Sequence, residues 1–466
     1  MSNFLALHTG LSGVRAAQAG IETASNNISN VNTDGYTRQR VDLSAKPTLQ
    51  LSAGRLGTGV NIDQISRMRE GFLDTRVRTT GESFAAADTK AQLLQRIEDI
   101  VAEPEAGLTG LLEGVWDAFE DLANDPSDTA SRQQVLSSLG AVAGRFQAID
   151  AGLSQLRSDT ASRPADGVSD VNALIEDVDR LNKEIFSASA GGAPPNDLLD
   201  RRDSALDELR SLAGATSEVV TTEGQEGMVK VTIGDVDVVV PGSEDDPDSI
   251  SENLEALGGE LGALHEALRV VPEAEDRTPD QLRTWEAALD DFAVAFAGQI
   301  HAAYADGVTD ADDEAIDDDD FDSLRPLIGF PEELNEDEVG AANIRVNPAI
   351  GPDDIVAGLG FEPGPLDGRN AEALAELRSG DLPDDWRSTV VDLGRATAAA
   401  TREADADEAL YTSAMSARQG AHGVSLDEEM VSLVQFQRAL EASSRVMTTI
   451  DEAMDVLINR TGLVGR

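Results

Sequence analysis

The chain has 466 residues, of which 41% are apolar, 4% are aromatic and none is cysteine. The lack of cysteine excludes disulfides, thiolate nucleophiles and cysteine-based zinc sites. The formal net charge is −51, from 36 basic and 87 acidic residues, and a surface this negative repels phosphate backbones, which argues against nucleic-acid binding. The length predicts two or three domains whose cores consist mainly of aliphatic residues.

The first residues predict a soluble protein without a cleaved signal. Residues 1–13 have no basic n-region and no apolar run of signal-peptide length. No stretch of the chain has the length of a membrane span. We therefore expect neither membrane insertion nor entry into the general secretion route.

Residues 3–30 are predicted to form a helix with a coiled-coil seam. Its apolar residues recur mostly in steps of three and four, at Phe4, Leu7, Leu11, Val14, Ile21 and Ile28. The Asn- and Gly-rich run 30–35 is turn-forming and ends this helix. Residues 36–65, which glycines interrupt, are predicted to be extended and looped.

Helical periodicity dominates the next part of the chain. It recurs at about 65–101, 108–122, 126–164, 168–185 and 279–304. Asp125-Pro126 predicts a helix start, with a capping side chain followed by proline in the first turn. Pro164 is expected to separate the two helical runs on either side of it. Together these stretches predict an antiparallel helical bundle.

The hydrophobic period changes near residue 215. Runs rich in β-branched residues at 219–222, 228–233 and 236–240 are separated by turn residues, which predicts a small β-meander. Residues 306–385 are acidic and rich in Gly and Pro, and they are predicted to form an irregular β-containing insertion. The predicted fold class is therefore mainly α with a β-containing insertion.

Helices are predicted to resume near Asp385 and to continue to the end, and the last of them carries a second seam. Ser425 followed by Glu428 predicts a capping box at its start. Its apolar residues again step by three, four and seven, at Leu433, Phe436, Leu440, Met447, Ile450, Met454 and Leu457. Matching seams at opposite ends predict that the chain returns on itself and that its terminal helices pair as a coiled coil.

The predicted layout is nested. Residues 1–62 and 415–466 form a terminal coiled-coil assembly domain, residues 63–214, 279–305 and 386–414 a helical bundle, and residues 215–278 and 306–385 the outer insertion. Residues 1–80 carry 9 basic and 6 acidic groups and residues 415–466 carry 5 and 7, so almost all of the net negative charge lies between them. The ends are suited to packing against protein and the body to facing water.

Catalytic and metal-binding motifs are incomplete. His265-Glu266 opens like a metalloprotease helix, but position 269, where the second His would be, is Arg. The acidic run 306–320 lacks the Gly and Glu that a calcium-binding EF-hand loop requires, having Ala315 and Phe321 at those positions. We expect no catalytic residue, no metal site and no cofactor, and hence no enzyme.

The terminal seams have two interpretations. Amphipathic helices commonly do no more than cover a core. A lone pair of long helices, however, buries too little apolar surface to be stable by itself. The seams therefore predict that these helices assemble with other copies or with neighbouring proteins.

Residues 25–39 resemble the N-terminal signature of the axial proteins of the bacterial flagellum. The residues of this motif are Asn27, Asn30, Asn32, Gly35, Tyr36, Arg38 and Gln39. The Tyr-Thr-Arg-Gln ending, residues 122–133 and residues 424–440 are similar to the hook-associated protein 1 family of hook–filament junction proteins. The likeness covers about 1–212, 280–304 and 385–466. It departs from the family after Tyr304, where acidic residues replace a glycine-spaced loop.

This resemblance implies a structural protein that is exported by the flagellar type III apparatus and joins hook to filament as a ring. The implied location is secreted, at the hook–filament junction. The implied partners are other copies of the chain, the hook protein, the second junction protein or filament subunits, and an export chaperone on the C-terminal helix. The motif is expected to shape the turn after the first helix rather than to bind a ligand, because Asn and Gly tolerate the required backbone angles.

Three alternatives remain open. The first is a hook or distal-rod subunit of the same apparatus, and the second is a cytoplasmic coiled-coil scaffold. The third is a protein that displays an enzyme or calcium-binding module in residues 215–385.

Overall fold

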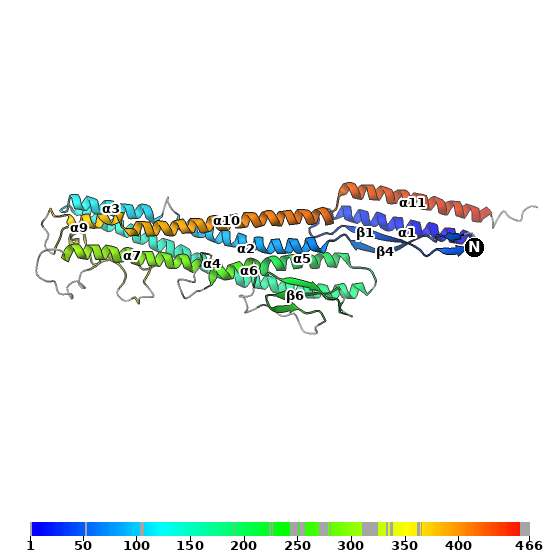
Figure 1. Ribbon diagram of the computed structural model, residues 1–466, viewed down its shortest axis with the longest axis horizontal. Helices are drawn as coiled ribbons and strands as arrows, with labels where there is room; N and C mark the ends of the chain where they lie inside the picture. The colour runs from blue at the N-terminus through cyan, green and yellow to red at the C-terminus, as the bar shows by residue number, and fades with distance from the viewer. Residues whose placement is uncertain are drawn as a thin grey trace, which may run out of the picture. The chain divides into compact units, whose positions relative to one another are not determined.

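The structure is a computed structural model (Figure 1), and it is mainly helical with small sheets, which confirms the predicted fold class. It describes residues 2–51, 54–102, 107–190, 192–222, 225, 227–242, 250, 257–269, 278–279, 281–309, 325–331, 334–335, 339–360, 364 and 366–456. Two compact units are present. Unit 1 comprises Met1–Ala85, Val168–Gly259 and Asp407–Arg466, and unit 2 comprises Ala86–Gly167 and Glu260–Ala406. The division into three domains remains a prediction.

Unit 1 contains the terminal helices and the helices that pack beside them. These are α1 (Ser2–Ser29), the first part of α2 (Gly71–Val101), the second part of α4 (Thr129–Ser189), α5 (Asn196–Ala213), the end of α10 (Asp381–His422) and α11 (Leu426–Asp455). The apolar residues of the run 168–185 recur at helical spacing, and Val171, Ile175 and Leu181 are all buried. This periodicity gives α4 the apolar face that packs into the core.

Strands follow α1 directly, as the sequence predicts for residues 36–65. Strands β1 (Gln39–Ala45) and β4 (Val60–Arg67) pair antiparallel, and β2 (Leu49–Leu51) pairs with β3 (Gly54–Leu56) between them. Strand β4 includes Ile65, where a helix was expected to begin, and α2 starts only at Gly71. Val60 and Ile62 alternate with polar residues, and an irregularity in the ladder next to Ile62 places Ile65 opposite Val41. β-branched residues in this arrangement explain why the stretch pairs as a strand.

The predicted β-meander is also present in unit 1. Strands β5 (Thr216–Val219), β6 (Val229–Ile233) and β7 (Val236–Val239) form an antiparallel sheet in that order. The side chain of Asn182 on α4 fixes the sheet, because its Nδ2 donates to the carbonyl of Val229 over 2.8 Å and its Oδ1 accepts from the N–H of Val229 over 3.0 Å.

Unit 2 is a helical bundle with short extended and 3₁₀ segments. Besides parts of α2, α4 and α10, it contains α3 (Leu108–Asn124), most of α6 (Gly259–Leu268), α7 (Leu282–Thr309), β8 (Ile328–Gly329), β9 (Arg345–Val346), η4 (Pro352–Asp354), α9 (Arg369–Glu376) and η5 (Leu377–Ser379). Aromatic rings fill its core. Phe146 packs against Phe292 and Phe296 on α7, and Trp386 packs against Phe292. The region 306–385 thus includes helical turns as well as the predicted short strands.

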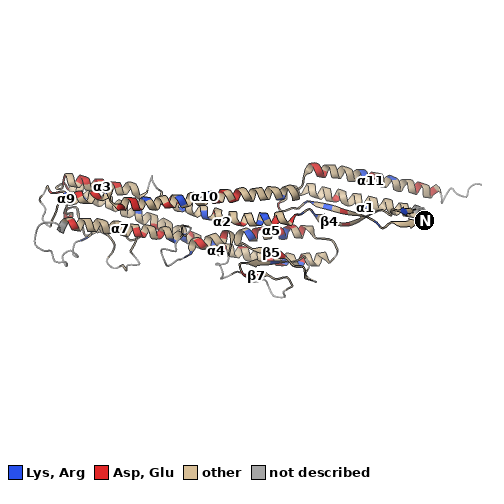
Figure 2. Cartoon of the chain, in the orientation of Figure 1, with Lys and Arg blue, Asp and Glu red and all other residues tan. Residues whose placement is uncertain are grey.

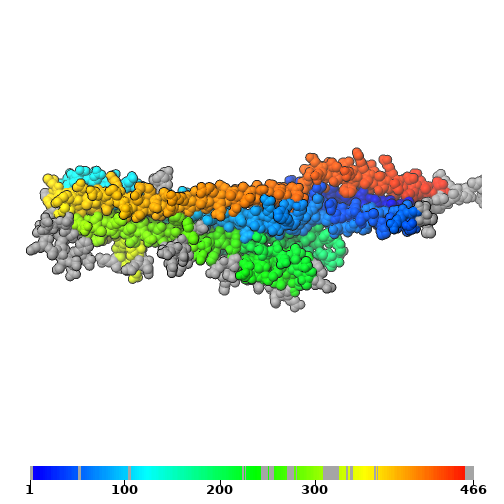
Figure 3. Space-filling model, in the orientation of Figure 1, coloured from blue at the N-terminus to red at the C-terminus, as the bar shows by residue number. Residues whose placement is uncertain are grey.

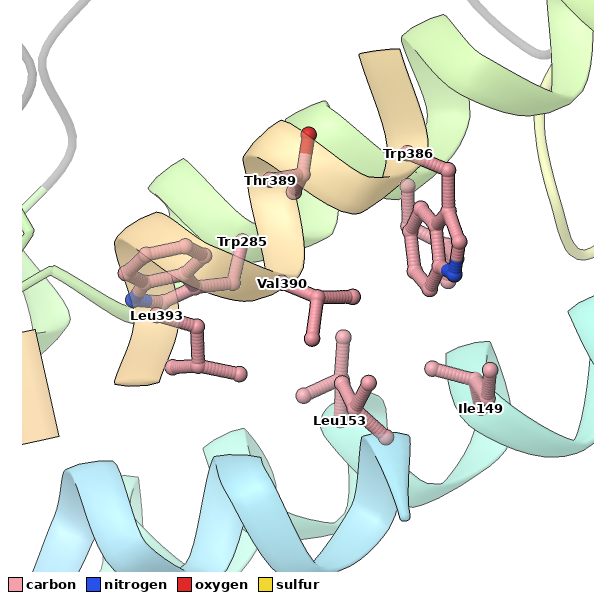
Figure 4. A pocket seen from close by; sticks show the side chains of 9 residues that line it. Ile149, Leu153, Trp285, Trp386, Thr389, Val390 and Leu393 are labelled. Atoms are coloured by element: carbon pink, nitrogen blue, oxygen red, sulfur yellow. The ribbon is translucent and has the colours of Figure 1, made fainter. Parts of the chain in front are cut away.

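A small apolar pocket opens in this core (Figure 4). It is lined by Val101, Ile149, Leu153, Trp285, Leu289, Trp386, Thr389, Val390 and Leu393. Its space of about 10 Å³ accommodates roughly one water molecule. Pockets that bind small molecules are far larger, about 300–1,000 Å³. The pocket is therefore a packing gap rather than a ligand site.

Helix α4 departs from the prediction at its start, near Pro126, and at Pro164. It begins at Thr129 rather than after Asp125, because the carboxylate of Asp128 accepts from the N–H groups of Ala130 and Ser131 and caps the helix. Pro126 lies in the turn before this cap. Pro164 lies inside the helix and does not end it. One missing backbone hydrogen bond is tolerable in a helix of 61 residues whose packing holds both sides.

The capping box predicted for α11 is absent. Ser425 occupies the N-cap position, but its side chain makes no capping hydrogen bond. The carboxylate of Glu428 forms an ion pair with Arg38 instead. The carboxylate that would complete the capping box therefore binds Arg38, which is distant in the sequence.

Candidate assembly interface at the paired termini

Helices α1 and α11 lie side by side and run antiparallel (Figures 1 and 3), as the matching seams predict. A Cβ atom placed on Gly10 would lie 3.0 Å from Cγ of Met447, and one placed on Gly20 would lie 2.5 Å from the ring of Phe436. Between them, a Cβ on Gly13 would lie 2.6 Å from the hydroxyl of Ser443. The two helix axes therefore approach as closely as glycine allows.

The face of α1 that meets α11 consists of small residues. They are spaced by three and four, at Gly10, Gly13, Ala17, Gly20, Ala24 and Asn27. Ala17 and Ala24 are each 2% exposed. The larger apolar residues predicted as the seam of this helix flank that face, and none of them is buried: Phe4 is 61% exposed, and half-buried are Leu7, Leu11, Val14, Ile21 and Ile28.

Helix α11 presents the bulky side of the pair. Its seam residues are all half-buried, at Leu433, Phe436, Leu440, Ser443, Met447, Ile450 and Met454. Leu457, the last predicted member, lies outside the described residues. On the remaining surface of the helix, Met430, Val431 and Val446 are at least half exposed. The described part of α11 buries Glu429 alone. The pair thus leaves much apolar side-chain surface open to contact.

Asn27 is a buried polar residue, 1% exposed, at the end of the small-residue face. Its Nδ2 donates to the carbonyl of Gln39 over 2.9 Å and to Oε2 of Glu429 over 3.1 Å. Its Oδ1 accepts from the hydroxyl of Tyr36 over 2.8 Å and from the N–H of Gln39 over 3.0 Å. One amide therefore ties α1, the segment after it and α11 together.

Arg38 completes this arrangement, which we call the terminal clamp: Asn27, Tyr36, Arg38, Gln39, Glu428 and Glu429. The guanidinium of Arg38 donates from Nε to Oε1 of Glu429 over 2.7 Å and from Nη1 to Oε2 of Glu428 over 2.6 Å. Burial, with the nearby carboxylates of Asp200 and Glu429, raises the pKa of Tyr36 to about 12. The phenol therefore stays protonated and can donate to Asn27 at any physiological pH.

Three other motif residues lie in or next to the turn after α1. Nδ2 of Asn30 donates to the carbonyl of Asn26 over 3.0 Å, and Asn32 is exposed in the turn. Gly35 has φ +74°, and a Cβ there would lie 2.4 Å from the hydroxyl of Ser204 on α5. The positive φ favours glycine at this position, and a larger residue would also force the hydroxyl of Ser204 to move.

His422, the last residue of α10, joins several segments at the start of α11. Its Nε2 accepts from the N–H of Glu70 over 2.6 Å, and its carbonyl accepts from the N–H of Arg38 over 3.0 Å. Its Nδ1 lies 3.8 Å from Oδ1 of Asp74. Burial lowers the pKa of His422, and the cations of Arg69 and Arg418 add to this effect against the opposing carboxylates of Asp74 and Glu70. The imidazole is therefore neutral at physiological pH.

A network of Arg–Asp pairs lies beside the clamp and connects β4, α2, α5 and α10. Its members are Arg67, Arg69, Asp74, Arg78, Asp200, Asp203, Asp207 and Arg418. Burial disfavours the charge on Asp203, but the guanidinium groups of Arg69 and Arg67 outweigh it and lower the pKa of that carboxyl. The network therefore keeps its charges paired at neutral pH and fixes the base of the terminal pair.

Sequence reasoning missed Glu429, His422 and the Arg–Asp network. For Glu429 a signal exists, because it lies four residues before Leu433 and so occupies a seam position of α11. A carboxylate on a mainly apolar seam requires a partner when it is buried. Nothing in the local sequence identifies that partner as Arg38 and Asn27.

Charge is distributed unevenly on the terminal helices (Figure 2). Helix α1 carries only Arg15 and Glu22 as charged residues, and Figure 2 shows it mostly in tan, the colour of uncharged residues. The first turn of α11 is acidic, with Asp427, Glu428 and Glu429. Carboxylates in the first turn of a helix are stabilised by the helix dipole. Because α1 itself carries only two charged residues, few charges on this helix oppose its association with another apolar surface.

The other candidate motifs of the sequence form no metal or catalytic site among the described residues. Among the described residues, no group of three or more His, Asp or Glu side chains is placed to hold a metal ion. Glu266 on α6 pairs with Gln281 and Arg269, which makes it part of an ordinary surface contact. Residues 310–320, the core of the acidic run, lie outside the described residues. No helix in the described part of the chain combines the length and hydropathy that crossing a bilayer requires.

Family models match three parts of the chain. The model described as "Flagellar hook-associated protein FlgK helical domain" matches residues 94–318. "Flagella basal body rod protein" matches residues 7–37, which contain most of α1 and the motif as far as Tyr36. "Flagellar basal body rod FlgEFG protein C-terminal" matches residues 419–460, which contain α11.

Two known proteins align over nearly the whole chain. Flagellar hook-associated protein 1 of Bacillus subtilis is 29% identical over 519 residues, covering 100% of both chains. The protein of the same name in Escherichia coli is 23% identical over 544 residues, covering 97% of this chain and 99% of its own. The solved flagellar hook junction protein FlgK from Burkholderia pseudomallei superposes with a TM-score of 0.55 at 16% identity, covering 75% of this chain and 100% of that one.

Proposed function

We infer that this chain, which belongs to the flagellar hook-associated protein 1 family, is a structural protein of the bacterial flagellum at the junction between hook and filament. The full-length alignment with the Bacillus subtilis protein carries this conclusion. The helical-domain match to residues 94–318 and the antiparallel pair of terminal helices support it.

The terminal pair is the part that assembles. In the single chain, the seam residues Leu433, Phe436 and Leu440 are only half-buried, and Phe4 at the other end is 61% exposed. Full burial of a large apolar side chain contributes about 1.5–3 kcal/mol, so roughly half of that is still available at each of these positions. Neighbouring copies in a ring, the hook protein below and the second junction protein or filament subunits above would supply it.

Two further parts of the proposal concern the chain before and after assembly. An export chaperone covers the C-terminal seam until secretion by the type III route, because exposed apolar stripes otherwise associate in the cell. The assembled protein acts without catalysis, as a spacer between two polymers of different subunits.

The alternative of a hook or distal-rod subunit finds partial support in the rod-type models, which match both ends of the chain. These ends are the segments that we propose to assemble, so their match does not distinguish a rod subunit from a junction protein. The match to the helical domain of the hook-associated family covers the long middle section and favours the junction. Deletion of the gene separates the two: bare but intact hooks indicate the junction, and absence of hooks indicates the alternative.

Leu440→Asp tests the assembling role of the α11 seam. The buried charge is expected to prevent incorporation at the hook tip while units 1 and 2 stay folded, as judged by circular dichroism of the purified chain. Leu410→Asp is the matched control, because Leu410 is 50% exposed on α10. The measurement is labelling of each variant in detached flagella. Normal filaments on cells that carry only Leu440→Asp contradict the proposal.

A further inference from the structure

The segment Gln39–Arg67, which we call the hairpin arm, leaves α1 as a long two-stranded hairpin and lies along that helix (Figure 1). Its base is held firmly. The terminal clamp binds Gln39, the carbonyl of Ile65 accepts from Nδ2 of Asn196 over 2.9 Å, and Arg67 pairs with Asp200. At mid-length, the N–H of Val60 donates to the hydroxyl of Ser12 over 3.2 Å.

The outer part of the arm exposes aliphatic side chains in cross-strand pairs. Leu43 is paired with Ile62, and these are 43% and 37% exposed. Leu49 is paired with Leu56 at the tip, and these are 47% and 46% exposed. A two-stranded hairpin is marginally stable in water by itself, and an exposed apolar one is a ready surface for association. We therefore expect another surface to cover the exposed aliphatic residues of the arm.

The charge of the arm indicates what covers it. It carries four basic and two acidic residues, in a chain whose acidic residues outnumber the basic ones by 87 to 36. Arg40 and Arg67 are paired within unit 1, but Lys46 and Arg55 form no ion pair among the described residues. With the arm at +2, the rest of the chain carries −53. In an assembly of identical copies, the complementary acidic surface is the body of the next copy.

We propose that the tip of the hairpin arm docks on the acidic body of a neighbouring copy of this chain, with Leu49 and Leu56 as the apolar contact and Lys46 and Arg55 as the charged one. This contact is additional to the packing of the terminal helices and rests on the proposed ring assembly. It is heterologous, so that each copy gives an arm to one neighbour and receives an arm from the other.

Photo-crosslinking in assembled flagella tests the contact. The photoreactive amino acid p-benzoylphenylalanine replaces Gln50, which is exposed in the tip, and detached flagella are irradiated. The expected product has twice the mass of the 49.2 kDa chain, with the crosslink joining the arm to an acidic segment of the same protein. A crosslink to a different flagellar protein, or none, overturns the proposal.

Charge variants provide the matched control. The double variant Lys46→Glu, Arg55→Glu is expected to lower the yield of the dimeric product by about fivefold, which corresponds to about 1 kcal/mol for two exposed pairs. The double variant Lys46→Arg, Arg55→Lys keeps both charges and is expected to give the wild-type yield. If the two double variants give the same yield, the electrostatic part of the proposal is wrong. If the wild-type chain is present in flagella but gives no dimer, the arm contact alone fails; if it is absent, the proposed function fails and the arm contact with it.

Discussion

Replacing Asn27 by Ala is expected to loosen the terminal clamp. The substitution removes an amide that is 1% exposed and whose two polar atoms make four hydrogen bonds, to the backbone of Gln39, to Tyr36 and to Glu429. The apolar methyl group that replaces it fits the small-residue face of α1. The loss therefore measures the polar contacts and not a steric change.

The magnitude follows from these four contacts. A neutral hydrogen bond contributes about 1 kcal/mol net and one to a carboxylate about 2 kcal/mol, so the four bonds contribute about 5 kcal/mol. Gln39 and Tyr36 are half-buried, and water can take over part of their bonding once the amide is gone. The net cost is then about 3 kcal/mol, which raises the population of the open clamp on the order of a hundredfold.

Amide hydrogen exchange followed by mass spectrometry reads this opening locally, which suits a chain of two units better than a global unfolding curve. Peptides covering residues 30–45 and 424–436 should exchange on the order of a hundredfold faster in Asn27→Ala, while peptides from α7 stay unchanged. Asn26→Ala is the matched control, because Asn26 is exposed and one residue away. Equal exchange in the two variants would show that the clamp does not hold the termini together.

Two further predictions concern the helix pair and the joint. Gly20→Ala should destabilise the α1–α11 pair by about 1–3 kcal/mol, because its methyl group would lie 2.5 Å from the ring of Phe436. The same change at Gly144, which has open space around it, should stabilise by up to about 1 kcal/mol; thermal melts that rank the two variants in the opposite order would contradict this. Since burial lowers the pKa of His422, its neutral form stabilises the joint fully above the unfolded pKa of 6.5, and this contribution is lost as the pH falls below that value toward the folded pKa. Protection of the amide of Glu70 should decrease over that range in the wild-type chain and not in His422→Gln, and identical pH profiles would sink the prediction.

The pairing of the terminal helices could be predicted from spacing alone, because a heptad repeat fixes which residues share a helix face. The composition of that face on α1 could not. Counting large apolar residues selects Phe4, Leu11 and Ile21, which flank the contact, whereas Gly20 and its small neighbours form it. Small residues give no hydropathy signal, and only the bulky residues of the partner helix show why they are needed.

Proline and capping residues predicted the helix ends less reliably than the apolar periodicity predicted the helices. Pro164 lies within α4 because the apolar repeat continues on both sides of it, and packing along that repeat outweighs one lost hydrogen bond. Asp128 and not Asp125 caps the helix, although both are aspartates close to its start. Competing caps of similar chemistry differ by a few tenths of a kcal/mol, which a sequence pattern does not resolve.

The terminal clamp could not be predicted, since Asn27 and Glu429 are 402 residues apart and neither belongs to a local pattern that names the other. Its chemistry nevertheless explains how the apolar surfaces can serve assembly. Half-buried aliphatic residues on α1 and α11 associate without fixing one geometry. Directional bonds of Asn27 and Arg38 to Glu429 fix the angle at which the pair leaves the rest of unit 1. The polar clamp therefore sets the geometry of the terminal pair, and the apolar surface that it leaves open supplies the free energy of assembly.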